Sequence, residues 1–344
     1  MPQDFERRWS ELNARLLQIE QSAGLAAALA ELQSHQRQSG FIKDRLDDVE
    51  RHSFHHPDDP SKILRAQYNP KRALRFGGSG ARRTPSDGPV RNDGCYLCRD
   101  NIQWQQQGAQ LGYDIRVGDN AYVALMNPFP LLPGHVVIAL RDHRSQDWLY
   151  QDGGGLEVSA LLHDLVALAN RMPGYVGFYN GVDAGASIPG HLHFQFFRRP
   201  EGEPDFPLER AARHDRAVNG HAELAGDYPL PVALWKGKPE DVVARASAWV
   251  SSWGDDNKAR LNGLTANFIA AREADGENVT LYFVPRDRAR PRGKGLSGLI
   301  GGLEVLGEIV LSCPEEKGRL DAGLIDYFAL EDALASVGTP FFVE

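Results

Sequence analysis

The N-terminal part of the chain shows the hydrophobic periodicity of amphipathic helices. Apolar residues recur at helical spacing at Leu12, Leu16, Leu17, Ile19, Leu25, Leu29 and Leu32. Gly24 interrupts this pattern, and glycine is unfavourable inside a helix. The pattern predicts a helical extension over residues 1–60 with a break near Gly24, and its leucine spacing would suit a homodimer contact.

The next stretch has no clear periodicity. Residues 51–94 are rich in Pro, Gly, Asp and Arg, which favour turns and loops. This composition predicts a segment with little regular structure. Within it, residues 67–72 are expected to form an ordered turn that faces a ligand.

Strand-like and helix-like patterns then alternate through the rest of the chain. The first series predicts strands at 121–127, 135–140 and 175–180, a helix at 156–172, and a last strand that ends near residue 199. A short helix is expected at 208–218. The second series predicts a helix at 239–253, strands at 264–271 and 279–285, and a strand or helix at 307–312. The repetition predicts an α+β protein with a first half at 61–215 and a second half at 216–344, which contains no His-x-His sequence.

Charge and composition limit the classes of function. The formal net charge of −8 disfavours nonspecific binding to nucleic acid. No stretch approaches the ~20 apolar residues of a membrane span, and the first residues lack the apolar core of a signal peptide. We therefore expect a cytoplasmic protein that binds neither nucleic acid nor membrane.

Residues 191–197 combine two histidines and a glutamine with alternating apolar residues. In a strand, His191, His193 and Gln195 would share one face, with neighbours on that face about 6.6 Å apart. Leu192, Phe194 and Phe196 would be buried on the other face. A neutral imidazole on such a face is a candidate nucleophile, although paired histidines are also common as satisfied core residues and as metal ligands.

The loop before this strand is made of small residues. Residues 184–190 include Gly185 and Ser187, so that exposed amides and a hydroxyl are available to bind a phosphate. A metallohydrolase is less attractive, because no Asp or His follows at short spacing to complete an open catalytic metal site. The pattern therefore favours phosphate chemistry at His193.

Two of the three cysteines form a Cys95-x-x-Cys98 pair, which excludes a disulfide framework. A thioredoxin-like pair should open a helix after a strand, and the flanking residues do not fit that arrangement. A structural zinc site is the better interpretation and needs two further ligands. The alternative is a pair of inert buried thiols.

Three segments together resemble a known superfamily. They are residues 127–138 (NPFPLLPGHVVI), residues 179–187 (YNGVDAGAS) and the motif His-x-His-x-Gln at 191–195. They are similar to the histidine-triad (HIT-like) superfamily, and most closely to its transferase branch, in which glutamine replaces the third histidine. This branch includes galactose-1-phosphate uridylyltransferases, diadenosine tetraphosphate phosphorylases and GDP-hexose phosphorylases. The sequence His-Leu-His-Phe-Gln most resembles the corresponding motif of the GDP-hexose phosphorylases.

The resemblance implies a HIT-like α+β fold of two tandem halves, each with an antiparallel sheet and packed helices. It implies a structural zinc ion held by Cys95, Cys98, His143 and His191. It implies no organic cofactor.

The resemblance also implies roles for single residues. His193 would form a nucleotidyl-histidine intermediate, and Gln195 would donate a hydrogen bond to the phosphoryl oxygens. The substrate-binding residues that it implies are Asn127, Asn180, Gly185, Ser187, Arg286 and Lys294. For the two asparagines and the two basic residues, a turn residue or a surface charge is the alternative interpretation.

The function that follows is phosphorolysis of a nucleoside diphosphate hexose, in which GDP-hexose and inorganic phosphate give GDP and hexose 1-phosphate. A dinucleoside polyphosphate phosphorylase is the second enzymatic hypothesis. A nucleotide-binding regulatory protein without turnover is the hypothesis from a different class. Each predicts a nucleotide or nucleotide-sugar ligand.

Overall fold

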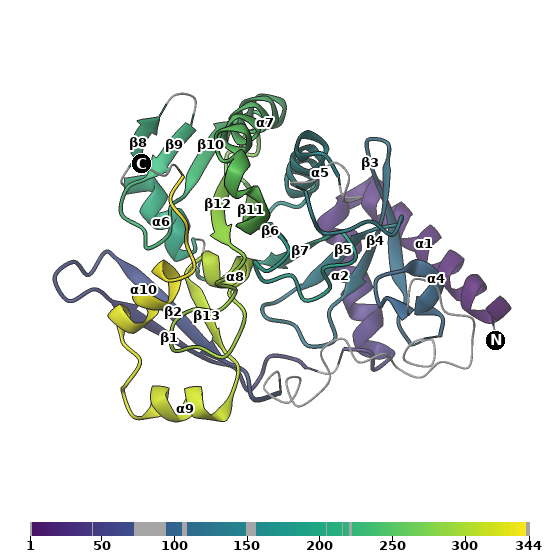
Figure 1. The fold of residues 1–344 in the computed structure, drawn as a ribbon. Coiled ribbons are helices and arrows are strands. Elements are labelled where there is room, and N and C mark those ends of the chain that lie inside the picture. Colours follow the sequence, from purple (N-terminus) through teal and green to yellow (C-terminus); the bar gives the residue numbers. More distant parts are fainter. Residues whose placement is uncertain are drawn as a thin grey trace.

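The centre of the molecule is one long antiparallel sheet (Figure 1). The computed structural model describes residues 2–42, 44–71, 94–104, 109–148, 156–203, 205–214, 216–219 and 222–341 of the 344 residues. In these residues ten strands follow one another in the order β3-β4-β5-β7-β6-β11-β12-β10-β9-β8. Every neighbouring pair is antiparallel.

The two halves contribute strands in mirrored order. The first half supplies β3 (Gly112–Val117), β4 (Asn120–Met126), β5 (Val136–Leu140), β6 (Tyr175–Asn180) and β7 (His193–Arg198). The second half supplies β8 (Arg216–Asn219), β9 (Ala222–Ala225), β10 (Ala233–Gly237), β11 (Leu264–Arg272) and β12 (Val279–Asp287). The halves join where β6 pairs with β11, with Asn180 opposite Asn267. One continuous sheet therefore crosses from the first half into the second.

Long helices cover one face of this sheet (Figure 1). They are α5 (Val158–Arg171) over the first half and α7 (Pro239–Asp256) over the second, and the two pack against each other. Strand alternation sends Phe194 and Phe196 into the core on this face, as the period of two predicts. Phe197 points into the separate core on the opposite face.

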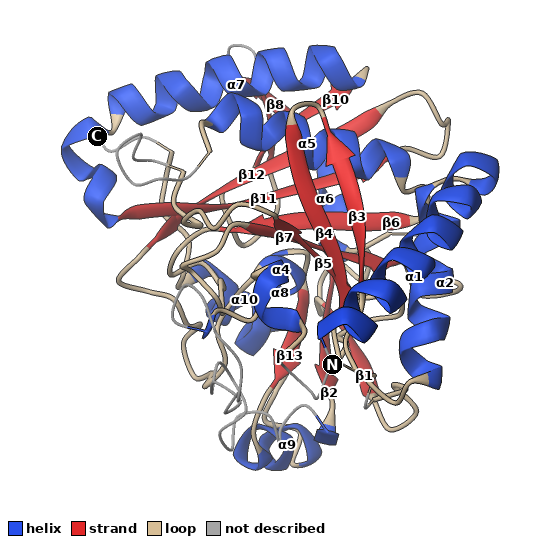
Figure 2. Cartoon of the chain, turned by 90° about the vertical axis from the view of Figure 1, so that its right-hand side faces the viewer, coloured by secondary structure: helices blue, strands red, loops and turns tan. Residues whose placement is uncertain are grey.

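The predicted N-terminal helices are confirmed up to Gln38, whereas the predicted extension to residue 60 was wrong, because residues 50–55 form a strand. The two helices are α1 (Pro2–Ala23) and α2 (Leu25–Gln38), and Gly24 breaks them with a φ of 86°. Helix α1 packs against β3, and α2 against β3 and β4, so the pair continues the helical layer beside α5 (Figure 2). Leu17 remains 49% exposed, whereas the other leucines named for the helical pattern are buried, because the helices pack on their own sheet.

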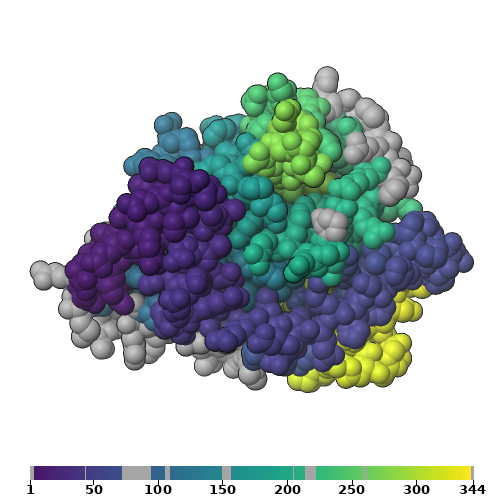
Figure 3. Space-filling view, turned by 180° about the vertical axis from the view of Figure 1, so that it is seen from behind, coloured from purple at the N-terminus to yellow at the C-terminus, as the bar shows by residue number. Residues whose placement is uncertain are grey.

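The opposite face carries a second, three-stranded sheet that the sequence did not predict. It consists of β1 (Glu50–His55), β2 (Ile63–Tyr68) and β13 (Glu308–Leu311), with β13 parallel to β2. Viewed from behind, residues near position 60 lie beside the C-terminal segment (Figure 3). The prediction of an irregular segment from residue 51 was therefore wrong for β1 and β2. The side chains of Glu308 and Arg51 pair across this sheet at 2.6 Å.

Short helices complete the molecule. They are α4 (Arg99–Ile102), α6 (Pro207–His214), α8 (Gly302–Val305), α9 (Pro314–Asp321) and α10 (Tyr327–Ala335), with a 3-10 helix at Lys258–Gly263. The helix predicted at 208–218 ends early, because β8 begins at Arg216 and pairs with β9. In the part of the chain that the structure describes, no helix has the length and apolar character needed to cross a bilayer.

A glycine in β6 makes the central packing testable. Gly177 lies opposite Phe196 in the β6–β7 ladder, and a Cβ atom on Gly177 would lie 2.0 Å from the Phe196 ring. Gly177→Ala is expected to lower the free energy of unfolding by about 1–3 kcal/mol, measured by denaturant titration, because the ring has to move in a filled core.

The matched control is Gly254→Ala in α7, where a Cβ atom meets nothing within 4 Å. This change is expected to raise stability by about 0.5–1 kcal/mol, because alanine loses less backbone entropy than glycine in a helix. Equal effects of the two substitutions would contradict the packing described for β6 and β7.

Candidate active site and metal cluster

His193 is held in one tautomer at the first position of β7. Its Nδ1–H donates to the backbone oxygen of His191 at 2.8 Å, which leaves the lone pair on Nε2. The side chain is only 3% exposed, and burial lowers the pKa of His193 to about 4 because desolvation disfavours the imidazolium. The geometry therefore presents a neutral imidazole with Nε2 as its nucleophilic atom.

His191 does not belong to the strand, contrary to the alternating pattern. Strand β7 begins at His193, and His191 lies in the bend before it. Its Nε2–H donates to the backbone oxygen of Leu140 at 2.6 Å, so its Nδ1 is the atom left to bind a metal. The polar face of the strand itself is formed by His193 and Gln195.

His135 fixes the orientation of Gln195. The backbone N–H of Leu131 donates to Nδ1 of His135 at 3.1 Å, so the proton of the neutral His135 ring is on Nε2. This Nε2–H donates to Oε1 of Gln195 at 2.9 Å. The amide NH2 group is consequently the donor end of Gln195, on the same face of β7 as His193.

The loop between β6 and β7 contains two of the predicted phosphate-binding residues. Gly185 has a φ of 95°, and a Cβ atom there would lie 2.3 Å from Cα of Gly301, so only glycine fits. Ser187 is exposed. Asn180 precedes the loop, and its Nδ2 donates to the backbone oxygen of Gly185 at 3.4 Å.

A buried network from the second half holds this loop. Nδ2 of Asn267 donates to Oδ1 of Asn180 and to the backbone oxygen of Ala184, each at 2.8 Å. Oδ1 of Asn267 in turn accepts from Nη1 of Arg286 at 2.7 Å. Arg286 is fully buried, and desolvation lowers its pKa to about 10. The structure thus links Arg286 to the loop through Asn267.

The other two predicted substrate-binding residues lie elsewhere. Asn127 accepts the backbone N–H of Phe129 at 2.9 Å in a turn, and its own N–H donates to the backbone oxygen of His135. Lys294 is exposed and forms an ion pair with Asp332 at 2.8 Å. Asn127 therefore adjoins the residue that orients Gln195, and Lys294 pairs with an acidic residue at the surface.

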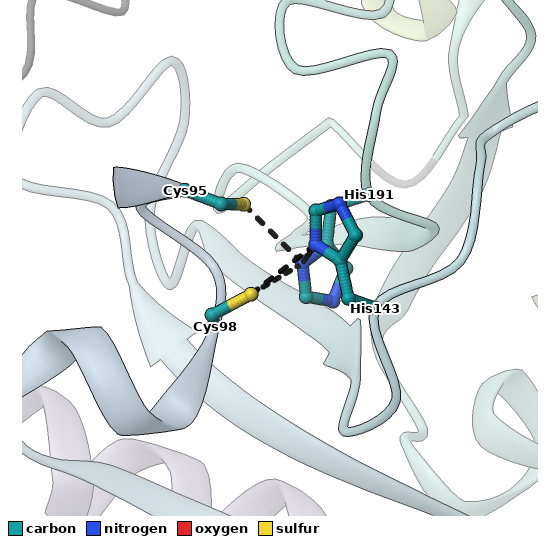
Figure 4. Close-up of side chains that lie close together, drawn as sticks. All are labelled: Cys95, Cys98, His143 and His191. Carbon is teal, nitrogen blue, oxygen red and sulfur yellow. Dashed lines mark hydrogen bonds between the residues drawn. The ribbon is translucent and has the colours of Figure 1, made fainter. Parts of the chain in front are cut away.

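The four predicted metal ligands converge on one point (Figure 4). Their ligand atoms all lie within 4.8 Å of one another. Sγ of Cys95 is 3.3 Å from Nδ1 of His191, and Sγ of Cys98 is 3.2 Å from Nδ1 of His143. The two Nδ1 atoms are 3.2 Å apart. The pKa of the Cys95 thiol is lowered, mainly by the neighbouring Cys98 and in part by His191.

These separations fit a tetrahedral metal ion. Zinc bonds of the usual lengths place nitrogen and sulfur ligands about 3.3–3.8 Å apart at the corners of a tetrahedron. The hydrogen bond from His191 to Leu140 is the kind of outer contact that orients a ligating imidazole. The cluster is therefore able to hold a metal ion such as zinc, as the sequence predicted.

Three residues that hold candidate site residues in place were not identified from the sequence. They are His135, Gln146 and Asn267, all buried. Asn267 could have been noticed from the sequence, because it lies within the apolar strand β11. A buried polar side chain in such a strand needs a hydrogen-bond partner. Gln146 could not be noticed in this way, because it lies in a segment without periodicity.

The chain thus combines an α+β fold built from two sheet-forming halves with a His-x-His-x-Gln sequence at 191–195. A family model described as a domain of unknown function, DUF4922, matches residues 32–198. No curated protein sequence matches the chain.

Solved structures show the same fold over most of the chain. Yeast Ap4A phosphorylase Apa2 in complex with Ap4A matches with a TM-score of 0.60 and 17% identity, over 90% of this chain and 97% of that chain. The complex of the same enzyme with AMP matches with a TM-score of 0.58 and 16% identity, over 90% of this chain and 96% of that chain. The expected HIT-like α+β fold is confirmed.

The metal cluster makes a direct prediction. Protein purified without chelator is expected to contain about one bound metal ion per chain, because four soft or borderline ligands converge. Cys98→Ser should lose most of that metal and lower the melting temperature. Elemental analysis and thermal unfolding measure both effects.

Cys313→Ser is the matched control, since Cys313 is the third cysteine and lies outside the cluster. It should retain the metal content and melting temperature of the wild type. A wild-type protein without metal, or equal metal loss in both variants, would exclude the assignment.

Proposed function

We propose that this protein is a nucleotidyltransferase that works through a nucleotidyl-histidine intermediate on His193. The observation that carries the proposal is the hydrogen bond from Nδ1–H of His193 to the backbone of His191, which leaves Nε2 as a nucleophile beside the amide of Gln195. Nε2 attacks the α-phosphorus of a nucleotide, and a P–N bond forms while the P–O bond to the leaving group breaks. The leaving group departs with the bonding electron pair.

The second step returns the enzyme to its starting state. An oxygen of inorganic phosphate attacks the same phosphorus, and the P–N bond breaks with its electron pair returning to Nε2. Two inversions at phosphorus give net retention. Because inorganic phosphate is the attacking group, the reaction is a phosphorolysis. His193 does not have to hold an additional proton between the two steps.

Gln195 supports a phosphate leaving group. An amide donates a hydrogen bond but cannot protonate a leaving group, and a phosphate departs without a general acid. His135 engages Oε1 of Gln195 and so directs the NH2 group to the phosphoryl oxygens. The exposed hydroxyl of Ser187 and the loop amides complete the proposed anion site.

Two substrate classes are supported by different observations. The sequence His-Leu-His-Phe-Gln resembles the GDP-hexose phosphorylases and favours a GDP-hexose, which would give GDP and hexose 1-phosphate. The fold shared with yeast Ap4A phosphorylase over 90% of the chain favours a dinucleoside polyphosphate. Both classes place a phosphate leaving group beyond the attacked phosphorus.

A zinc ion is the metal that we propose for Cys95, Cys98, His143 and His191. When bound, zinc would fix the position of its four ligands and take no part in the chemistry. His191 connects the cluster to the nucleophile, because its backbone oxygen accepts the Nδ1–H of His193. The ligands therefore help to hold the reacting imidazole.

The intermediate can be observed directly. The protein is mixed with a pool of GDP-, ADP- and UDP-sugars and dinucleoside polyphosphates in phosphate-free buffer, and its intact mass is measured. A gain of one nucleoside monophosphate, lost again when phosphate is added, is the expected result. The size of the gain identifies the base, and the released products identify the substrate class.

His193→Ala should abolish this mass gain while nucleotide binding remains measurable. His52→Ala is the control, because His52 is a 43% exposed histidine on β1. A mass gain that persists in His193→Ala would exclude His193 as the nucleophile. Binding without any mass gain in the wild type would favour the regulatory alternative.

Gln195→Glu tests the donor role of the amide. A carboxylate can still accept the hydrogen bond from His135, but it places a negative oxygen where the NH2 group faces the phosphoryl oxygens. The rate of nucleotidylation should fall about 100-fold, as measured by rapid quench, which is typical for loss of one donor to a developing negative charge. Gln21→Glu, on the exposed face of α1, should keep the wild-type rate; equal rates in all three proteins would contradict the donor role.

A further inference from the structure

We propose that Gln146 is a positioning residue, whose side-chain amide replaces a missing strand pairing and holds the nucleophile His193 where β6 and β7 separate. The inference rests on the proposed function, because it explains how this reaction's nucleophile is placed. Gln146 is fully buried and lies in the segment that follows β5. It contributes no atom to the proposed chemistry.

The register of the sheet shows where the pairing is missing. Strands β6 and β7 pair from Tyr175 with Arg198 to Phe178 with Gln195. Continuation of this register would place Asn180 opposite His193, but the ladder ends two residues earlier. On its other edge His193 still pairs with Ala139 of β5. The strands therefore separate at the position of the nucleophile.

The side chain of Gln146 occupies this gap. Its Oε1 accepts the backbone N–H of His193 at 2.8 Å. Its Nε2 donates to the backbone oxygens of His193 and Asn180, each at 2.9 Å. These bonds satisfy backbone groups of both strands, as a peptide unit of an intervening strand would.

The chemistry of this position is selective. The site needs one acceptor and two donors on a short planar group, and among side chains of this length only an amide supplies both. A buried backbone group left without a partner costs about 1–3 kcal/mol. Direct pairing of Asn180 with His193 would satisfy the same groups, but it would bring the ends of β6 and β7 together and move His193 from the position that it has here.

Gln146 is itself firmly held. Its backbone N–H donates to the oxygen of Pro189 at 2.9 Å, and its backbone oxygen accepts from the hydroxyl of Tyr179. The next two residues contact the second half: Asp147 pairs with Arg288 at 2.6 Å, and Trp148 packs edge-on against Phe268. The fixed side-chain amide of Gln146 therefore holds the backbone of His193 in one position.

The test is Gln146→Glu, which has nearly the same shape. The carboxylate keeps the acceptor for the His193 N–H but loses both donations and repels the two backbone oxygens. The rate of nucleotidyl-histidine formation in a single turnover should fall about 100-fold, as expected for a misplaced reacting group. The affinity for a nucleotide product should change far less than this rate.

Asn257→Asp is the matched control. Nδ2 of Asn257 also donates to two backbone oxygens, those of Trp253 and Phe341, at the end of α7 in the second half. Both substitutions convert a buried amide into an acid and should lower the melting temperature. Only Gln146→Glu should slow nucleotidylation; an equal loss of rate in both variants would show a general defect in stability and overturn the proposal.

Chemical rescue separates positioning from damage to the fold. In a His193→Gly background, free imidazole can serve as the nucleophile, and its position does not depend on the backbone of residue 193. Addition of Gln146→Glu should then cost little further rate. A persistent 100-fold loss with free imidazole would overturn the positioning role, and Gln146→Met serves as a neutral second variant if Gln146→Glu does not fold.

Hydrogen exchange tests the role of Gln146 independently of the proposed function. The amide of His193 is bonded to Gln146, so the peptide that spans residues 191–195 should exchange faster in Gln146→Glu and not in Asn257→Asp. Absence of a nucleotidyl adduct in the wild type would refute the proposed function alone. Unchanged exchange in Gln146→Glu would refute the proposal for Gln146.

Discussion

The pairing of β6 with β11 is the interaction on which the site depends. It joins the sheets of the two halves and places Asn180 directly opposite Asn267. Because the N–H of Gly181 also donates to the oxygen of Ala266, the start of the loop between β6 and β7 is tied to the second half. The half without a His-x-His motif is therefore part of the framework of the candidate site, and its removal would release that loop.

The second half reaches the site through buried polar groups. Arg286 holds Asn267, and Asn267 holds both Asn180 and the loop at Ala184. A buried guanidinium is costly in free energy, so its retention here needs hydrogen bonds to fixed oxygens, which it makes to Asn267 and to the backbone of Ile300 and Val337. This chain of contacts gives a structural reason for an arginine at position 286, where the resemblance implied substrate binding.

Local patterns predicted what depends on neighbours in sequence. Alternation in residues 192–197 identified the buried face of β7, and Gly24 marked the break between two helices. Strands β1 and β2 escaped prediction because β2 pairs with β13, and the side chains of Gln67 and Glu308 that meet there are 241 positions apart. The metal ligands His143 and His191 came from the resemblance, since no spacing rule connects them to Cys95 and Cys98.

The sequence led us to expect that a backbone carbonyl fixes the tautomer of His193, but the particular partners that orient His193 and Gln195 were beyond sequence analysis. His193 and Gln195 are each set by one hydrogen bond, from Nδ1–H to the His191 backbone and from His135 to Oε1. The first bond selects one of the two tautomers of His193, and the second selects one of the two orientations of the Gln195 amide. A sequence pattern does not predict which of the two is present. Both partners adjoin strands of the central sheet, because His135 directly precedes β5 and His191 lies in the bend before β7. In the reaction proposed above, this arrangement would favour attack on phosphorus, since neither His193 nor Gln195 would have to turn when the substrate arrives.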